Sequence, residues 1–253
     1  HYVRNFMPHL SYNQPSFYAD MGEIRDEITA RAAAGRLDTA PQKHYAGPRR
    51  AIEELYDCEK DPRQLNNLAG SAAHARALAR MRKRMKEWIM RTRDTGFLPE
   101  SDMAMRMGDG SPLRMASDPA VYPLENILMA AEMVGREGME AGQVAALGDP
   151  DPAVRFWAAV GLHAAGGGSS AGVAALNEAL GDDSPPVRIE AAWALCDAGE
   201  TDRAVAVLEN DLRDADLRVA LRAARALQMI GEKARPALIA MKAAWTGESV
   251  SLS

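Results

Sequence analysis

The sequence is poor in the residues from which most catalytic and metal sites are built. It has 2 cysteines and 5 histidines in 253 residues, and neither a Cys-x-x-Cys nor a His-Glu-x-x-His pattern occurs. The histidines do not stand at the spacing of metal ligands, so the residues themselves predict no metal site. His163 lies among alanines and is interpreted as structural. No glycine-rich loop suited to cradling phosphate is present.

Long apolar runs are also absent. A membrane-spanning helix needs roughly 20 such residues, so we predict no membrane span. The chain begins at His1 and shows no signal peptide, and we interpret it as a fragment or a processed product of a longer protein. Cys58 and Cys196 are interpreted as free thiols, with a disulfide between two domains as the alternative.

The overall composition is that of an ordinary globular protein, but the charged residues are distributed unevenly along the chain. Hydrophobic residues make up 47% and charged residues 26%, and the length suits two domains. Residues 1–111 carry 18 Lys and Arg against 15 Asp and Glu, whereas residues 112–253 carry 12 against 20. Because phosphate contacts dominate affinity for nucleic acids, the acidic half argues against a nucleic-acid partner.

The amino-terminal half reads as a small unit of strands, loops and helices. Strands are expected at 1–6 and 54–56, with a polar connector at 37–48. A helix is expected at 18–34, with Met21, Ile24 and Ile28 on one face. Asp61-Pro62 favours a turn, after which Leu65 and Leu68 begin a helical spacing.

A second helix is expected at 71–92, with Ser71 as its N-cap. Its apolar stripe contains Leu78, Met81, Met85 and Trp88, with Ile89 beside the stripe. The opposite face is basic, with Arg76, Arg80, Lys83, Arg84 and Arg91. This face is either a solvated surface or a site for an anionic membrane or a sulfated polymer.

Three stretches carry a resemblance to a known family. The central one is Glu54-Leu55-Tyr56-Asp57-x-x-x-Asp61-Pro62-x-x-x-x-Asn67-Leu68-Ala69. Residues 2–9 (Tyr-Val-Arg-Asn-Phe-Met-Pro-His) lie upstream of it, and residues 94–100 (Asp-Thr-Gly-Phe-Leu-Pro-Glu) lie downstream. In this order they resemble the carboxy-terminal subdomain of the type I sulfatases, in the heparan-N-sulfatase-like and arylsulfatase-like branch. The resemblance covers roughly residues 1–105.

The resemblance implies chemistry that this chain does not carry. Such sulfatases need a cysteine or serine within C/S-x-P-S/A-R, matured to formylglycine, and a carboxylate cluster that holds calcium. Cys58 and Cys196 are followed by other residues, and no Asp-Asp-x-Gly signature occurs. Calcium and formylglycine are therefore implied only for a full-length parent, periplasmic or extracellular, and this chain alone is expected to be inactive. Substrate contact by His1, Arg4 and His9 is conceivable; the alternative is a strand and loop held by local hydrogen bonds.

The carboxy-terminal half repeats. Asp149-Pro-Asp-Pro-Ala-Val-Arg-Phe recurs from Asp182 and from Asp214, so that Val154, Val187 and Val219 follow at steps of 33 and 32 residues. Paired alanines, a leucine and a helix-stopping glycine keep the same register: Ala158/Ala159, Ala191/Ala192 and Ala223/Ala224; Leu162, Leu195 and Leu227; Gly166, Gly199 and Gly231. A weaker copy begins at Asp118. This period predicts a solenoid of helix pairs similar to short HEAT-type repeats.

The expected helix pairs are 138–147 with 152–165, 171–181 with 185–198, and 201–213 with 215–230, closed by a helix at 233–245. Asp149, Asp182 and Asp214 are interpreted as helix caps rather than as a metal ladder. Val187 should face a seam between repeats and Arg188 a surface. We expect the weak copy at 118–134 to pack against Phe97, Leu98 and the helix face that bears Trp88.

The predicted fold is thus a small α+β sulfatase-like subdomain at 1–105, with a short antiparallel sheet plus helices, a linker at 106–117 and an all-α HEAT-like solenoid at 118–253. The leading functional hypothesis is the carboxy-terminal part of a sulfatase, a sulfuric ester or sulfamate hydrolase, whose amino-terminal domain is a missing partner. In that case the repeats serve packing or the docking of a substrate or partner. The alternative is a free-standing helical scaffold that binds a protein partner or a sulfated glycan.

Overall fold

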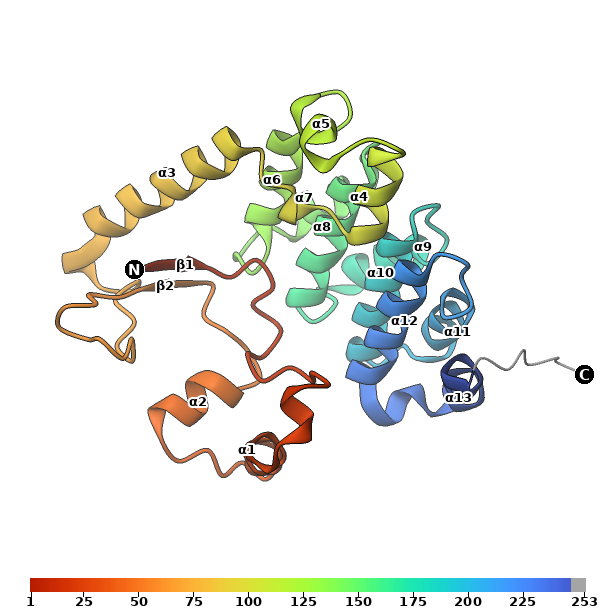
Figure 1. Ribbon diagram of the computed structural model, residues 1–253, viewed down its shortest axis with the longest axis horizontal. Coiled ribbons are helices and arrows are strands. Elements are labelled where there is room, and N and C mark those ends of the chain that lie inside the picture. Colours follow the sequence, from red (N-terminus) through yellow and green to blue (C-terminus); the bar gives the residue numbers. More distant parts are fainter. Residues whose placement is uncertain (247–253) are drawn as a thin grey trace, which may run out of the picture. The chain divides into compact units, whose positions relative to one another are not determined.

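The computed structural model describes residues 1–246, which are mostly helical (Figure 1). Contacts divide the chain between Arg91 and Thr92 into two compact units, whereas the sequence predicted a boundary after residue 105. The predicted linker at 106–117 is also largely structured. It contains the end of α4 (Glu100–Met107) and all of α5 (Pro112–Ser117). Ser111 starts α5 by accepting a hydrogen bond from the amide of Arg114, with Pro112 in the first turn.

The first unit contains the predicted antiparallel strand pair. Strands β1 (Tyr2–Arg4) and β2 (Glu53–Leu55) pair with Tyr2 opposite Leu55. The amide of Asn5 donates to the carbonyl of Ile52 at 2.9 Å, which extends the pairing beyond the strands. A two-stranded ribbon is marginally stable by itself, so the surrounding loops and helices must hold it.

The helices between the two strands differ from expectation. Residues 18–34 form a 3₁₀ turn, η1 (Ala19–Met21), followed by α1 (Glu23–Ala33). Their expected apolar face is open, because Met21 and Ile24 are 64% and 86% exposed. The expected connector contains α2 (Ala40–Ala46), which begins with a reciprocal capping box between Thr39 and Gln42. This Thr-x-x-Gln pattern is readable in the sequence and was missed.

The expected helix at 71–92 is present as η2 (Ala72–His74) and α3 (Ala75–Thr92). Ser71 stands at the N-cap position, although its side chain makes no capping hydrogen bond. The helical spacing assigned to Leu65 and Leu68 was wrong, because both residues lie in irregular chain outside any helix. Leu78 and Ile89 are buried as predicted, but Trp88 is 51% exposed and does not belong to the buried stripe.

The second unit begins with a segment that packs on the weak first repeat copy. A 3₁₀ turn, η3 (Thr95–Phe97), precedes α4, and α6 (Leu124–Met133) forms from the weak copy. Tyr122 is fully buried and donates a hydrogen bond to the carbonyl of Asp94. Phe97 is also buried, and its carbonyl accepts from the indole of Trp157 at 2.8 Å. The weak copy packs within this unit on Asp94 and on η3, the turn that contains Phe97. The part of the expectation that concerns Trp88 stays a prediction.

The repeat helices follow the predicted pairs to within a few residues (Figure 1). They are α7 (Glu140–Ala146) with α8 (Pro152–Ala164), α9 (Ser170–Ala179) with α10 (Pro185–Ala198), and α11 (Asp202–Asp211) with α12 (Leu217–Ile230). The recurring alanines are fully buried where α8 meets α10, as Ala158, Ala159, Ala191 and Ala192 show. Val187 is fully buried too, as expected for a seam residue. Small side chains at these positions let neighbouring helices approach closely.

Glycine ends the repeat helices as the sequence predicted. Gly199 has φ of +99°, and the amides of Gly199 and Glu200 donate back to the carbonyls of Cys196 and Leu195. This is the Schellman arrangement, which favours glycine because its left-handed conformation crowds a Cβ atom. The expected closing helix at 233–245 is only partly α-helical. It consists of a 3₁₀ segment, η4 (Gly231–Ala237), and α13 (Leu238–Thr246), because Pro236 lacks an amide hydrogen.

Candidate functional site

The predicted substrate-contact residues lie along one short stretch of the first unit. The terminal amine of His1 donates to the carbonyl of Tyr56 at 2.8 Å, and Nδ1 of its ring is 2.5 Å from Oε1 of Gln64. The Arg4 guanidinium donates to the carbonyl of Ile52 at 3.2 Å. His1 precedes β1, whereas Arg4 is the last residue of the strand and is buried. His9 lies in the loop that follows β1.

A buried carboxylate that sequence reasoning missed lies at the centre of the first unit. Glu54 is 3% exposed and accepts hydrogen bonds from Tyr12 Oη at 2.7 Å, Tyr56 Oη at 2.5 Å and Asn5 Nδ2 at 2.9 Å. Its Oε2 atom also lies 3.8 Å from Nε2 of His44. Asn5 directly follows β1, Tyr12 lies in the loop beyond it and Tyr56 directly follows β2, so one carboxylate ties three segments together.

The surroundings of Glu54 set its charge state. Burial raises the pKa of this carboxyl, but the hydrogen bonds from Tyr56, Tyr12 and Asn5 outweigh burial and hold the pKa below its ordinary value. Burial, together with the hydrogen bonds to Glu54, raises the pKa of Tyr12 and of Tyr56. An ionised carboxylate with a lowered pKa has no proton to donate, and it is a weak base because its oxygens already accept several hydrogen bonds. The cluster is therefore suited to fixing the loop rather than to acid–base catalysis.

A second carboxylate connects the strand ribbon to α3. Glu53 accepts from Tyr2 Oη at 2.6 Å and from Arg82 Nε at 2.6 Å. The second guanidinium nitrogen of Arg82 donates to the other oxygen of the same carboxylate, so the pair is bidentate. Arg82 therefore stabilises the fold through Glu53, whereas the arginines on the opposite side of α3 do not bind this carboxylate.

The repeats carry a ladder of arginine–aspartate pairs. Arg155 binds Asp182 through two hydrogen bonds of 2.7 and 2.8 Å. One repeat later, Arg188 binds Asp211, whose residue is 1% exposed, at 2.7 Å. Each arginine also donates to backbone carbonyls of the loop before its own helix, as Arg188 does to Asp182. Arg155 therefore joins its own loop to the loop before α10, and Arg188 joins its own loop to the end of α11. Arg188 is thus not the simple surface residue that the sequence suggested.

The three repeating aspartates hold turns rather than capping helices directly. The carboxylates of Asp149, Asp182 and Asp214 each accept the amide hydrogen of the residue two positions on, at 2.8 Å in every case. Those residues, 151, 184 and 216, are the N-cap residues of α8, α10 and α12. Asp151 and Asp216 then cap through their own side chains. This arrangement is an Asx-turn. As in a helix cap, a carboxylate accepts a hydrogen bond from a backbone amide, but the aspartate lies two residues before the N-cap residue.

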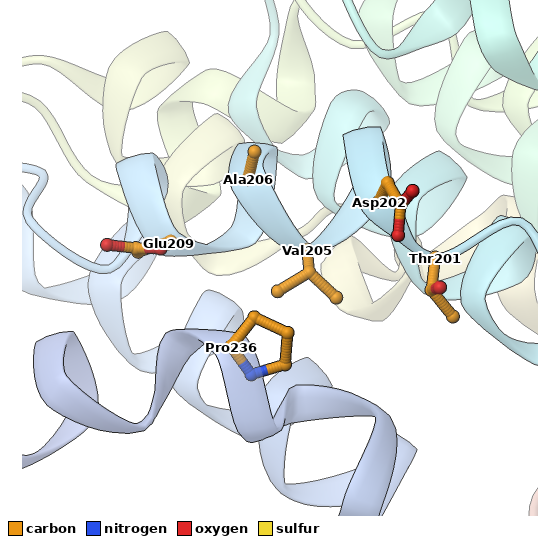
Figure 2. A pocket seen from close by; sticks show the side chains of 6 residues that line it. All are labelled: Thr201, Asp202, Val205, Ala206, Glu209 and Pro236. Carbon is orange, nitrogen blue, oxygen red and sulfur yellow. The ribbon is translucent and has the colours of Figure 1, made fainter.

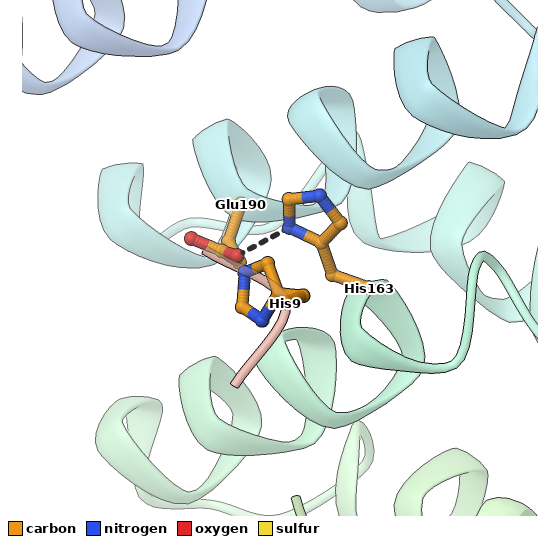
Figure 3. Close-up of side chains that lie close together, drawn as sticks. All are labelled: His9, His163 and Glu190. Atoms are coloured by element: carbon orange, nitrogen blue, oxygen red, sulfur yellow. Dashed lines mark hydrogen bonds and ion pairs between the residues drawn. The ribbon is translucent and has the colours of Figure 1, made fainter. Parts of the chain in front are cut away.

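A buried histidine joins α8 to α10. The Nδ1 atom of His163 lies 2.8 Å from Oε1 of Glu190 (Figure 3). Its Nε2 atom lies 3.0 Å from Oδ2 of Asp197. Arg222 of α12 donates to the second oxygen of Glu190 at 3.0 Å. Burial lowers the pKa of His163, but the hydrogen bonds to Asp197 and Glu190 outweigh it and raise the pKa to about 9. His163 is thus a charged residue of the array's interior, which agrees with its structural interpretation.

Shallow grooves lie on both units. In the second unit, α11 and Pro236 border a groove of about 190 Å³ between two carboxylates, Asp202 and Glu209 (Figure 2). In the first unit, α1 and Gln42 border an open groove of about 350 Å³, with Ile24 and Ile28 among the residues that line it. Neither groove contains a histidine, a cysteine or a pair of carboxylates in contact, so neither has the composition of a catalytic site.

The sulfatase machinery does not fit the residues present. Cys58 is exposed and Cys196 is buried in α10, and neither has the required sequence context. The run Ser184-Pro-Pro-Val-Arg188 departs from C/S-x-P-S/A-R by one residue. Its residues are used by the repeat, because Ser184 is the N-cap of α10, Val187 is fully buried and Arg188 binds Asp211. No site for formylglycine or calcium is therefore assigned to residues 1–246.

Comparison with known proteins supports a helical repeat and a partial likeness to a sulfatase. Residues 140–228 and 173–247 match the family model of HEAT repeats. Over 121 residues the chain is 31% identical to an ulvan-active sulfatase of Formosa agariphila. This match takes in 47% of the chain but only 20% of the sulfatase. None of the helices in residues 1–246 has the length and apolar character needed to cross a bilayer.

Proposed function

We propose that this chain is the non-catalytic carboxy-terminal part of a sulfatase, extended by HEAT repeats. The 31% identity over 121 residues to a protein named as an ulvan-active sulfatase carries the proposal. The lack of a fitting nucleophile context in the chain supports it. In this proposal the nucleophile and the calcium ligands belong to a preceding domain. His1, Arg4 and His9 would then contribute to substrate contact at the edge of that domain.

The repeats give this part of the protein its second role. The array exposes apolar side chains on α12, among them Leu217 and Leu221, which are 75% and 68% exposed. In a linear array each repeat contacts only its neighbours, and its open surfaces serve as binding surfaces. We therefore include the docking of a substrate or a partner in the proposed function of the HEAT repeats.

The coding sequence upstream of His1 tests the proposal directly. The expected finding is an in-frame C/S-x-P-S/A-R motif within a few hundred codons, preceded by a segment for export. A start codon immediately before His1 would instead favour the second candidate, a free-standing scaffold that binds a protein partner. The regular HEAT pairs and their match to the family model favour that candidate next.

A further inference from the structure

The surface of α3 that faces away from its buried side is strongly basic. Over its 18 residues the helix has seven lysines and arginines against one acidic residue, Glu87. We define the basic face of α3 as Arg76, Arg80, Lys83, Arg84 and Arg91. Because a helix turns about 100° per residue, these five residues fall within about 100° of one another. The buried residues Leu78 and Ile89 lie on the opposite side.

The charges of the basic face are largely uncompensated. All five side chains are exposed. Among the described residues, Arg76, Arg80 and Arg91 form no salt bridge, whereas Arg82 on another side is held by Glu53. Lys83 and Arg84 approach only Glu87, at 3.9 and 3.5 Å. Exposed pairs of this length contribute little, so the face keeps a concentrated positive potential.

The shape of this face suits a linear polyanion. With a rise of 1.5 Å per residue, the row from Arg76 to Arg91 extends over about 22 Å. Planar guanidinium groups bind oxyanions with paired hydrogen bonds. Insertion into a membrane would need a free apolar face, but Leu78 and Ile89 are buried and Met81 and Met85 are half-buried.

We propose that the basic face of α3 binds a sulfated polysaccharide. The choice of this polyanion over a nucleic acid rests on the proposed sulfatase function, since a sulfatase part gains by holding its polymer near the active centre. Charge complementarity supplies the affinity, and the contacts are made by groups that the fold does not otherwise use. A second polyanion of similar charge density, duplex DNA, is the discriminating comparison.

The test measures binding of the complete chain to heparin and to chemically desulfated heparin over a series of salt concentrations. The variant Arg76→Gln/Arg80→Gln/Arg84→Gln removes three charges and keeps good helix formers. Its matched control, Arg114→Gln/Arg136→Gln/Arg235→Gln, removes three exposed charges from the second unit. We expect the first variant to bind heparin at least tenfold more weakly, with a salt dependence flatter by about two to three units. The control should bind like the wild type, and desulfated heparin and duplex DNA should bind more weakly than heparin.

Several results would overturn this proposal. They are an unchanged affinity of the α3 variant, an equal loss in the control, or equal binding of desulfated heparin or of duplex DNA. Circular dichroism of each variant checks that its helices are retained. Failure here is distinct from failure of the proposed function, because an upstream sulfatase motif can be present whether or not heparin binds to α3.

Discussion

Arg188 of α10 holds the carboxylate of Asp211, the last residue of α11, through both Nε and Nη2, at 2.9 and 2.7 Å. The Asp211 side chain is 1% exposed and that of Arg188 is 20% exposed. The interaction joins two repeats at a point where water has little access. Removal of one partner therefore leaves the other as a buried charge, and neither water nor another side chain can take the place of the lost partner.

The first prediction is that Arg188→Ala is strongly destabilising. An arginine on a simple surface would contribute roughly 1 kcal/mol at most. Breaking a buried pair from one side costs about 3–5 kcal/mol, and Asp211 is the partner left behind. Urea denaturation of the wild type and the variant measures the difference in unfolding free energy. Arg213→Ala, which removes an exposed arginine paired with Glu209, is the control. A cost for Arg188→Ala no larger than that control would contradict the buried-pair interpretation.

The second prediction concerns the seam between repeats. Val187 is fully buried in α10, so Val187→Asp places a charge without a partner in the packed interior. We expect a loss of roughly 3 kcal/mol or more in unfolding free energy. Ala174→Asp introduces the same charge on the exposed side of α9 and should cost well under half as much. Equal costs would show that the helix phase assigned to the repeats is wrong.

The third prediction is a pH dependence that arises from His163. Its pKa in the folded chain is about 9, above the ordinary value of 6.5. Below pH 6.5 both folded and unfolded states are protonated, and the full stabilisation is present. Between 6.5 and about 9 the folded state retains a proton that the unfolded state has lost, so this contribution falls as pH rises, by up to about 1.4 kcal/mol per unit. Above pH 9 the contribution is lost.

Urea midpoints measured between pH 6 and pH 9.5 show this effect as a difference between two proteins. The wild type should lose stability over this interval, and His163→Gln should lose on the order of 3 kcal/mol less. Taking the difference removes the contribution of other titrating groups. Parallel profiles for the two proteins would mean that Glu190 and Asp197 do not hold His163 in its charged form.

The sequence predicted most of the array and little of its side-chain connections. The period of Val154, Val187 and Val219 fixes which residues lie at the seam, because each repeat meets the next in the same way. The partner of Arg188 was not predictable from that period. Asp211 belongs to α11, whereas the corresponding partner of Arg155 is Asp182 in a loop. Packing decides that Arg188 binds Asp211 and not Asp214, which stands at the repeat position of Asp182. A one-dimensional pattern contains no information about packing.

The first unit shows the opposite balance. Its predicted strands formed, but the site that holds them was missed, because Glu54 looks in the sequence like any other charged strand residue. Only the tertiary approach of Tyr12 and Asn5 gives its carboxylate buried partners. The helix α2 was missed for a different reason. Its signal, Thr39 followed by Gln42, is local and could have been read from the sequence.

The fourth prediction is that the isolated chain hydrolyses no sulfate ester. It has neither the nucleophile context nor the calcium ligands that the sulfatase resemblance implies, and without an activated nucleophile no covalent route is open. A chromogenic aryl sulfate incubated with the purified chain should show turnover no faster than buffer. Turnover that a single substitution in this chain removes would place the active centre within it and contradict the proposal.

The fifth prediction concerns α4, which occupies part of the expected linker. Arg106 donates to Asp102 at 2.8 Å and forms two hydrogen bonds with Asp151, the N-cap residue of α8, at 2.8 and 2.7 Å. Its side chain is only 10% exposed. A protease must open such a segment locally before it can cut. We therefore expect trypsin to cut after Arg106 more slowly than after Arg63, which is exposed in a turn.

Mass spectrometry of the earliest tryptic fragments measures the order of these cuts. Arg106→Lys keeps a trypsin site while weakening the bidentate contact with Asp151, so cutting at residue 106 should become faster in that variant and stay unchanged at Arg63. The same contact predicts that α4 remains joined to the repeats when the first unit has been trimmed. Rapid cutting at Arg106 in the wild type, with release of two separately stable fragments, would show that residues 106–117 behave as the free linker that the sequence suggested.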